Sequence, residues 1–143
     1  MPILSTRQVN DLERLTITVS GTSRGIMFSE LGDEIGRILP TTGELQSTQE
    51  FTLAASSLPD LMAEFLGVIL EGIKEGIVHT LWQCTSAVSM PGNIHKLYIL
   101  THAEDIESLV ELDIIATKWF NVNGSSQVEE TAEVVLRIPS SLG

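Results

Sequence analysis

Cysteine, aromatic residues and basic residues are all scarce in this chain of 143 residues, which has one cysteine, 5% aromatic residues and eight lysines and arginines. The single cysteine, Cys84, excludes a disulfide within the chain. No apolar run reaches the roughly 18–20 residues of a membrane-spanning helix, so we expect none. The segment 1–10 also lacks the basic and apolar regions of a signal peptide. Together with the single cysteine, these absences predict a cytoplasmic protein.

Acidic residues greatly outnumber the basic ones: nineteen aspartates and glutamates give the chain a formal net charge of −11. A negative field of this size repels phosphate backbones, so we expect no direct binding of nucleic acid. The acids are distributed over 30–34, 71–75, 104–113 and 129–133, which favours a role in solubility. A basic surface on a partner protein is the alternative use of this charge.

Apolar residues are abundant: 43% of the chain is hydrophobic, enough for a single domain over 1–143 with one core. The central segment, 51–90, predicts a strand over 51–55, a helix over 58–72 and a strand over 77–90. The helix has apolar residues at the i, i+3, i+4, i+7 spacing of one buried face. They are Leu58, Leu61, Met62, Phe65, Leu66, Ile69, Leu70 and Ile73.

Serine and glycine residues mark the ends and one side of the expected helices. The serines at 56–57 can cap the first turn of the central helix. Gly72 or Gly76 can end it in the left-handed conformation that glycine adopts without strain. In the helix expected before Pro40, Gly32 and Gly36 are four residues apart. They share one side of that helix, where another backbone can come close.

The flanking segments add a helix and more strands. Alternation of apolar and polar residues predicts strands over 15–21, 97–102, 113–122 and 128–138. A second amphipathic helix ends before Pro40. Its apolar face consists of Phe28, Leu31, Ile35, Ile38 and Leu39.

Three segments lack such a pattern. We expect a loose arm over 1–11, a polar connector over 41–48, and one helical turn or a structured loop over 103–111. The remaining elements follow the order β-α-β-α-β-β-β-β. This order predicts an α+β fold, in which two helices pack on one face of a mixed, mainly antiparallel sheet of about six strands.

Cys84 and His79 are the candidates for catalysis. A cysteine nucleophile needs a nearby base, and His79 lies five residues earlier, on the opposite face of the expected strand. Another histidine could approach Cys84 only through the fold. Because a lone cysteine in the middle of a strand is usually a small core residue, we expect no catalytic role for it.

No motif indicates a metal or a cofactor. His79, His95 and His102 lack the His-x-His and His-x-x-x-His spacings of metal sites. The segment 21–25 lacks the Gly-Lys-Ser/Thr ending of a phosphate-binding loop. We therefore expect neither a metal nor a cofactor.

Nearly the whole chain resembles the archease family in the order of its elements. The segment 16–21 resembles the first strand of that family, and 51–55 with 61–70 resembles its second strand and amphipathic helix. The segments 114–120 and 132–138 resemble its last two strands. The resemblance implies the archease architecture, an α+β fold.

The functional positions of archeases carry different residues here. Archeases bind a divalent metal through an aspartate just before the first strand and another in the last strand, and these positions are Arg14 and Arg137. The lysine and histidine of the family fall on Ile115 and Phe120. Archeases assist the guanylylation of a tRNA-splicing RNA ligase. The resemblance therefore implies a partner-binding role that has lost its metal.

A shorter likeness involves the strand around Cys84. The segments 76–79 and 83–87 are similar to the glutamine-histidine-threonine-serine-alanine strand of the YjbQ-type secondary thiamine-phosphate synthase family. Cys84 takes the place of the key histidine of that family, and no matching tryptophan-glutamine motif follows.

Arg14 and Arg137 suggest a binding site if they are neighbours, because two guanidinium groups can grip a phosphate or a carboxylate. Alternatively, each arginine pairs with a nearby acid such as Glu13 or Glu133. Three functions stay open. We expect first a non-catalytic binding or modulator domain resembling archease. The second is an enzymatic alternative, either a small enzyme using Cys84 and a histidine or a YjbQ-like protein. The third is an acidic adaptor for a basic protein.

Overall fold

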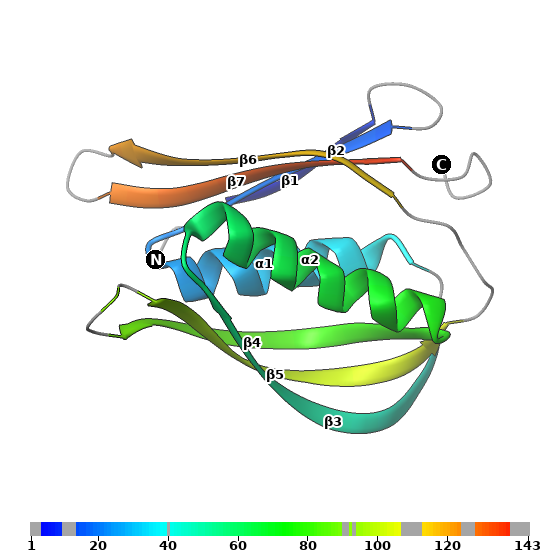
Figure 1. Cartoon of the computed structure of the whole chain (residues 1–143). Helices are drawn as coiled ribbons and strands as arrows, with labels where there is room; N and C mark the ends of the chain where they lie inside the picture. The colour runs from blue at the N-terminus through cyan, green and yellow to red at the C-terminus, as the bar shows by residue number, and fades with distance from the viewer. Residues whose placement is uncertain are drawn as a thin grey trace.

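A computed structural model describes residues 4–9, 14–39, 41–89, 92, 94–106, 113–123 and 128–137. Within them, two helices and seven strands follow one another along the chain (Figure 1). They are β1 (Leu4–Val9), β2 (Arg14–Gly21), α1 (Arg24–Arg37), β3 (Thr41–Ala55), α2 (Leu58–Lys74), β4 (Ile77–Ser89), β5 (Ile94–Ile106), β6 (Asp113–Asn123) and β7 (Val128–Arg137). The α+β class is confirmed, as is the expected order from β2 onward.

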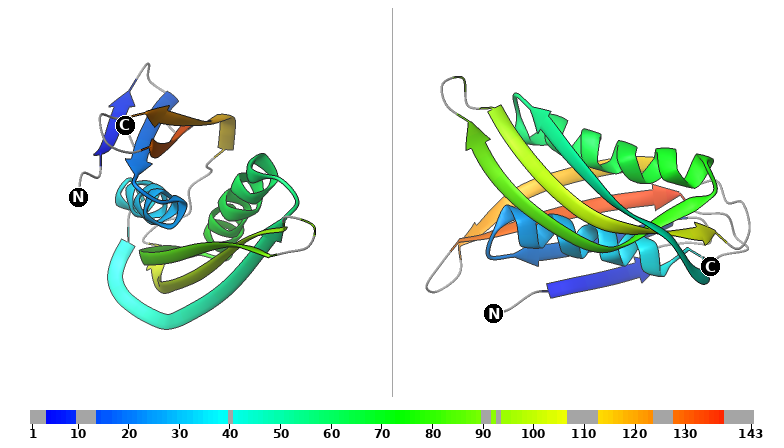
Figure 2. Two further views of the ribbon diagram at one scale, coloured as in Figure 1. Left: turned by 90° about the vertical axis from the view of Figure 1, so that its left-hand side faces the viewer. Right: turned by 90° about the horizontal axis from the view of Figure 1, so that it is seen from below.

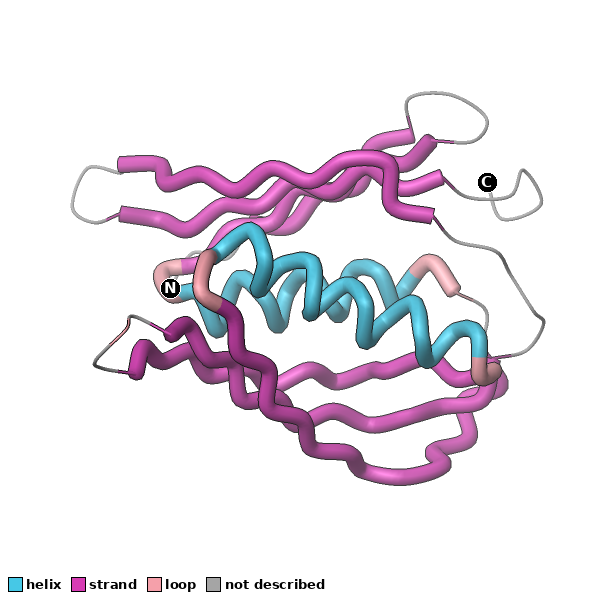
Figure 3. The backbone as a smooth tube through the Cα atoms, viewed as in Figure 1, coloured by secondary structure: helices cyan, strands magenta, loops and turns pink. Residues whose placement is uncertain are grey.

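The strands form two sheets, and the helices lie between them (Figures 1 and 3). The first sheet has the order β1-β2-β7-β6 and the second has the order β3-β5-β4, with antiparallel pairing throughout. The expected single sheet of about six strands is therefore divided in two. Alternation along a strand cannot distinguish one sheet from two. In both arrangements every strand turns its apolar face to the helices.

The helices form a middle layer that both sheets cover (Figure 2). Phe28 of α1 and Phe65 of α2 are fully buried, with 4.9 Å between their ring centroids. Burying a phenylalanine side chain stabilises a fold by roughly 1.5–3 kcal/mol. Among the described residues, neither helix is long and apolar enough to cross a membrane.

The expected helix caps are present. The side chain of Ser57 accepts a hydrogen bond from the backbone N–H of Asp60 at 3.2 Å. Gly76, which follows the C-terminus of α2, has a φ of 85°. Local sequence therefore determines where this helix begins and ends, although it runs to Lys74, two residues beyond the expected end.

The expected loose arm over 1–11 is wrong for residues 4–9. They form β1, which pairs with β2 from Leu4↔Ser20 to Val9↔Leu15. A polar edge strand can be held by backbone pairing alone, so it leaves little alternation in the sequence. Residues 1–3 and 10–11 lie outside the described residues.

Two other connecting segments are also strands. The expected polar connector over 41–48 is the first half of β3, with register shifts between Thr41 and Leu45 and between Leu45 and Ser47. The expected turn or loop over 103–111 continues β5 as far as Ile106. Both segments are strands because β5 pairs with β3 on one side and with β4 on the other. Residues 107–111, Met90 and Ile138 lie outside the described residues.

Candidate functional site

Arg14 and Arg137 lie directly opposite each other on neighbouring strands of the first sheet. They are Cα partners in the β2–β7 pairing, next to the buried pair Leu15 and Leu136. Directly opposed residues in an antiparallel sheet have Cβ atoms about 4.5–5.5 Å apart. The two arginine positions are therefore neighbours, as the hypothesis of a shared site requires.

Asp113 extends this arginine pair onto a third strand. It is the Cα partner of Arg137 in the β6–β7 pairing, so Arg14, Arg137 and Asp113 form one row across β2, β7 and β6. We call these three positions the arginine row. The row has a formal charge of +1, in a chain whose net charge is −11. Opposite charges on paired strands stabilise a sheet, whereas like charges directly opposite destabilise it.

Asp113 is not among the candidates that the sequence indicates. Glu133, which the sequence offers as an alternative partner for the arginines, is instead the Cα partner of Thr18 and of Lys118. Glu13, the other alternative, lies outside the described residues. Only the register of β6 against β7 identifies Asp113, and no local pattern in the sequence reveals that register.

The strand β4 contains a bulge that changes which residues face the helices. Thr80 pairs with His102 and Gln83 with Leu100, so β4 has one extra residue at this point. Leu81, within the bulge, has a φ of 54° and a side chain that is 61% exposed. A residue with a Cβ in this left-handed region stores roughly 1–2 kcal/mol of strain.

The bulge overturns the expected faces of His79 and Cys84. Both side chains face the helical layer, whereas alternation predicts opposite faces. The ring of His79 lies against that of Trp82, with centroids 5.6 Å apart, and Cys84 packs against the same core. An inserted residue shifts the alternation by one position, so residues before and after it share a face.

Cys84 has the environment of a core cysteine. Burial raises the pKa of its thiol to about 12, although a hydrogen bond with Ser29 acts in the opposite direction. At neutral pH the thiol is therefore protonated, and the protonated form is a poor nucleophile. This chemistry opposes the enzymatic alternative.

His79 is also a core residue. Only 5% of it is exposed, and its ring lies 5.5 Å from that of Phe51, measured between centroids. Burial lowers the pKa of His79, which favours the neutral imidazole. Its Nδ1 atom is buried and has no hydrogen-bond partner among the described residues.

The histidines do not gather around a common point. His102 contacts Thr48, with 3.1 Å between Nδ1 and Oγ1, whereas His79 lies in the core. In the part of the chain that the structure describes, no three histidine, cysteine or acidic side chains come close enough to hold a metal ion.

The helix α1 packs closely along β4, and glycines permit the approach. A Cβ at Gly32 would lie 2.6 Å from the ring of Trp82, and one at Gly36 would lie 3.3 Å from the carbonyl oxygen of His79. The expectation that another backbone approaches this side of the helix is thus confirmed. Ser29 and Asp33 of the same helix accept hydrogen bonds from the backbone of β4.

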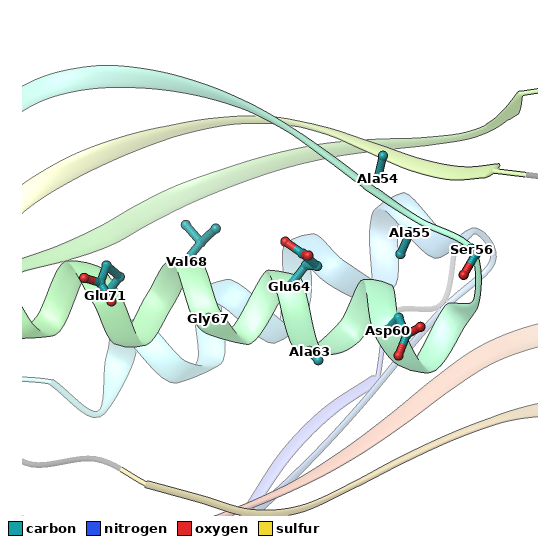
Figure 4. Close-up of a pocket in the computed structure, with 9 residues that line it drawn as sticks. All are labelled: Ala54, Ala55, Ser56, Asp60, Ala63, Glu64, Gly67, Val68 and Glu71. Carbon is teal, nitrogen blue, oxygen red and sulfur yellow. The ribbon is translucent and has the colours of Figure 1, made fainter.

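A groove of about 730 Å³ lies between α2 and the end of β3 (Figure 4). Three of its lining residues are acidic and none is basic, while the helical surface between the acids is made of small side chains. The lining residues are Ala54, Ala55, Ser56, Asp60, Ala63, Glu64, Gly67, Val68 and Glu71. We call it the α2 groove.

These elements define an α+β protein with a helical layer between two antiparallel sheets. The same fold occurs in the solution structure of Methanobacterium thermoautotrophicum protein 1598, a structural genomics target. That structure matches with a TM-score of 0.62 and 12% identity, over 90% of this chain and 95% of the other. At this identity the likeness shows the fold alone. No family model and no curated protein sequence matches the chain.

Proposed function

We propose that this protein is a non-catalytic binding or modulator domain, and that the arginine row binds an anionic group of its ligand or partner. The observation that supports this proposal is the register of Arg14 against Arg137. The proposal also includes a cytoplasmic location, which rests on the single cysteine.

The chemistry of the row favours a phosphate or a carboxylate. Each guanidinium offers several N–H donors in a planar fork, which matches two oxygens of such a group. Asp113 contributes one formal negative charge to the row, which therefore has a formal charge of +1. Because the rest of the chain repels anions, we expect weak binding that depends on a bidentate fit and decreases with salt.

The resemblance to archeases supports a modulator role. In that family, aspartates at the positions of Arg14 and Arg137 bind a divalent metal. Arginines at these two positions invert the charge preference of the site, from a cation to an anion. The fold can then be kept for binding a protein partner while the ligand of the site changes.

Arginine side-chain NMR tests this proposal directly. Inorganic phosphate and ATP are added to ¹⁵N-labelled protein at low salt, and the Nε–Hε signals are assigned with Arg14→Lys and Arg137→Lys variants. We expect the signals of Arg14 and Arg137 to shift together and saturate. Arg37, which forms ion pairs with Glu30 and Glu34, is the internal control. Silence from Arg14 and Arg137, or an equal shift of Arg37, would reject the proposal.

A further inference from the structure

We infer that the open edge of β3 and the α2 groove together form a docking site for an extended, basic segment of another protein. This inference goes beyond the arginine row, which lies in the other sheet. Three observations support it: backbone N–H groups have side-chain acceptors at one edge of the second sheet, the other edge has no second strand among the described residues, and an acidic groove lies beside that other edge.

The edge of the second sheet formed by β4 is closed at Trp82 and Cys84. The backbone N–H of Trp82 donates to Asp33 Oδ1 at 3.1 Å, and that of Cys84 donates to Ser29 Oγ at 2.9 Å. The bulge at Leu81 interrupts the same strand. Side-chain acceptors and bulges are common means of preventing an edge strand from pairing with another chain.

The opposite edge, formed by β3, is open among the strands that the structure describes. This strand has 15 residues, and β5 is its one neighbour within the described sheets. An edge strand presents a row of backbone N–H and C=O groups on its free side, and an added strand can satisfy them.

The α2 groove provides room beside this edge. Its walls are the end of β3 and one flank of α2, as Figure 4 shows. Ala63 and Gly67 lie on that flank, and a Cβ at Gly67 would meet no atom within 4 Å. An added strand could therefore approach the backbone of α2 at these two positions.

The negative charge of the groove favours a basic occupant. Asp60, Glu64 and Glu71 line it without a basic residue among them. At 1.5 Å per helical residue, Asp60 and Glu71 are separated by about 16 Å along α2, the length of roughly five residues of a strand. Lysines or arginines at alternate positions of an added strand can face these acids. A second copy of this chain, with a net charge of −11, would bring like charges together instead.

The test uses a fluorescent seven-residue peptide in which lysine alternates with valine or threonine. Two N-methylated forms carry methyl groups on the amides of either one or the other edge of the strand. We expect the unmodified peptide to bind and the amide signals of β3 to shift in NMR spectra. Methylation of one edge should weaken binding at least tenfold, while methylation of the other should have little effect. Equal binding by both forms, or no binding of the unmodified peptide, would overturn the inference.

Matched variants separate the groove from net charge. Replacing Glu64 and Glu71 by Gln should weaken peptide binding at least fivefold, whereas replacing Glu75 and Glu133 by Gln changes the net charge equally and should not. Equal weakening would mean that net charge alone attracts the peptide, which would overturn the inference. Replacing Arg14 and Arg137 by Lys should leave peptide binding intact, so the two proposals fail separately. Dimers whose formation shifts the β3 signals would overturn the inference in favour of a second copy.

Discussion

Asp33 of α1 and Trp82 of β4 are joined by a hydrogen bond in which the backbone N–H of Trp82 donates to Asp33 Oδ1 at 3.1 Å. The bond lies next to the bulge at Leu81, on the edge of β4 that faces away from its partner strand β5. The carboxylate thus satisfies a backbone donor that the sheet itself leaves open. We therefore expect this contact to contribute measurably to the stability of the fold.

Replacing Asp33 by Ala should destabilise the protein by about 1–3 kcal/mol, because a part-buried N–H group loses its acceptor. Asp33→Asn keeps an acceptor oxygen in the same place and should cost clearly less. Urea denaturation at pH 7 measures both values. Equal stability of the two variants would show that the hydrogen bond contributes nothing.

The stability contributed by Asp33 should also depend on pH. Burial is the main cause that raises its pKa, while the hydrogen bond from Trp82 acts in the opposite direction. A carboxyl whose pKa is raised on folding stabilises the folded state below its unfolded value of about 3.9, and this contribution is lost as the pH rises. The stability of the wild type relative to Asp33→Asn should therefore fall from pH 4 towards pH 7. A difference that does not change with pH would contradict this expectation.

Two glycines on the two helices should respond in opposite ways to the same substitution. A Cβ at Gly32 would come within 2.6 Å of the Trp82 ring, so Gly32→Ala must push α1 away from β4 and should cost about 1–3 kcal/mol. A Cβ added at Gly67 on α2 would meet no atom within 4 Å, so Gly67→Ala should stabilise the helix by up to about 1 kcal/mol. Thermal unfolding of the two variants measures both effects. Destabilisation by both would mean that the side of α2 containing Gly67 is covered.

Cys84 should resist alkylation in the folded protein. Burial raises the pKa of its thiol to about 12, so almost no thiolate is present at pH 8. We expect iodoacetamide to react at least 100-fold more slowly with native protein than with protein in 6 M guanidinium chloride. Mass spectrometry follows the modification. Native reaction as fast as in the denaturant would revive the enzymatic alternative.

The elements that local sequence can predict differ from those that depend on distant pairing. The helix α2 is predictable because its apolar spacing, Ser57 and Gly76 all act within a few residues of the chain. The strand β1 is not, because its partner β2 provides the pairing that defines it. The bulge at Leu81 is equally hidden, since one inserted residue changes the faces of β4 without changing its composition.

The candidate site shows the same division. The sequence leaves open whether Arg14 and Arg137 are adjacent, and the register of β2 against β7 places the two positions opposite each other. The presence of Asp113 in the same row depends on how β6 pairs with β7, and the local sequence does not predict that register. Likewise, the open edge of β3 becomes visible only when the strands are assigned to two sheets.

His79 should make the protein less stable in mild acid. Burial lowers its pKa in the folded protein, whereas an unfolded chain binds a proton with a pKa of about 6.5. For a group whose pKa is lowered on folding, the stabilising contribution is complete above the unfolded value and is lost as the pH falls towards the folded one. The free energy of unfolding should therefore decrease between pH 7 and pH 5.

His79→Leu removes this titration, and it also removes an Nδ1 atom that has no hydrogen-bond partner among the described residues. The variant should show a smaller decrease over the same range, measured by urea denaturation at each pH. An identical decrease in both proteins would assign the acid sensitivity to other groups.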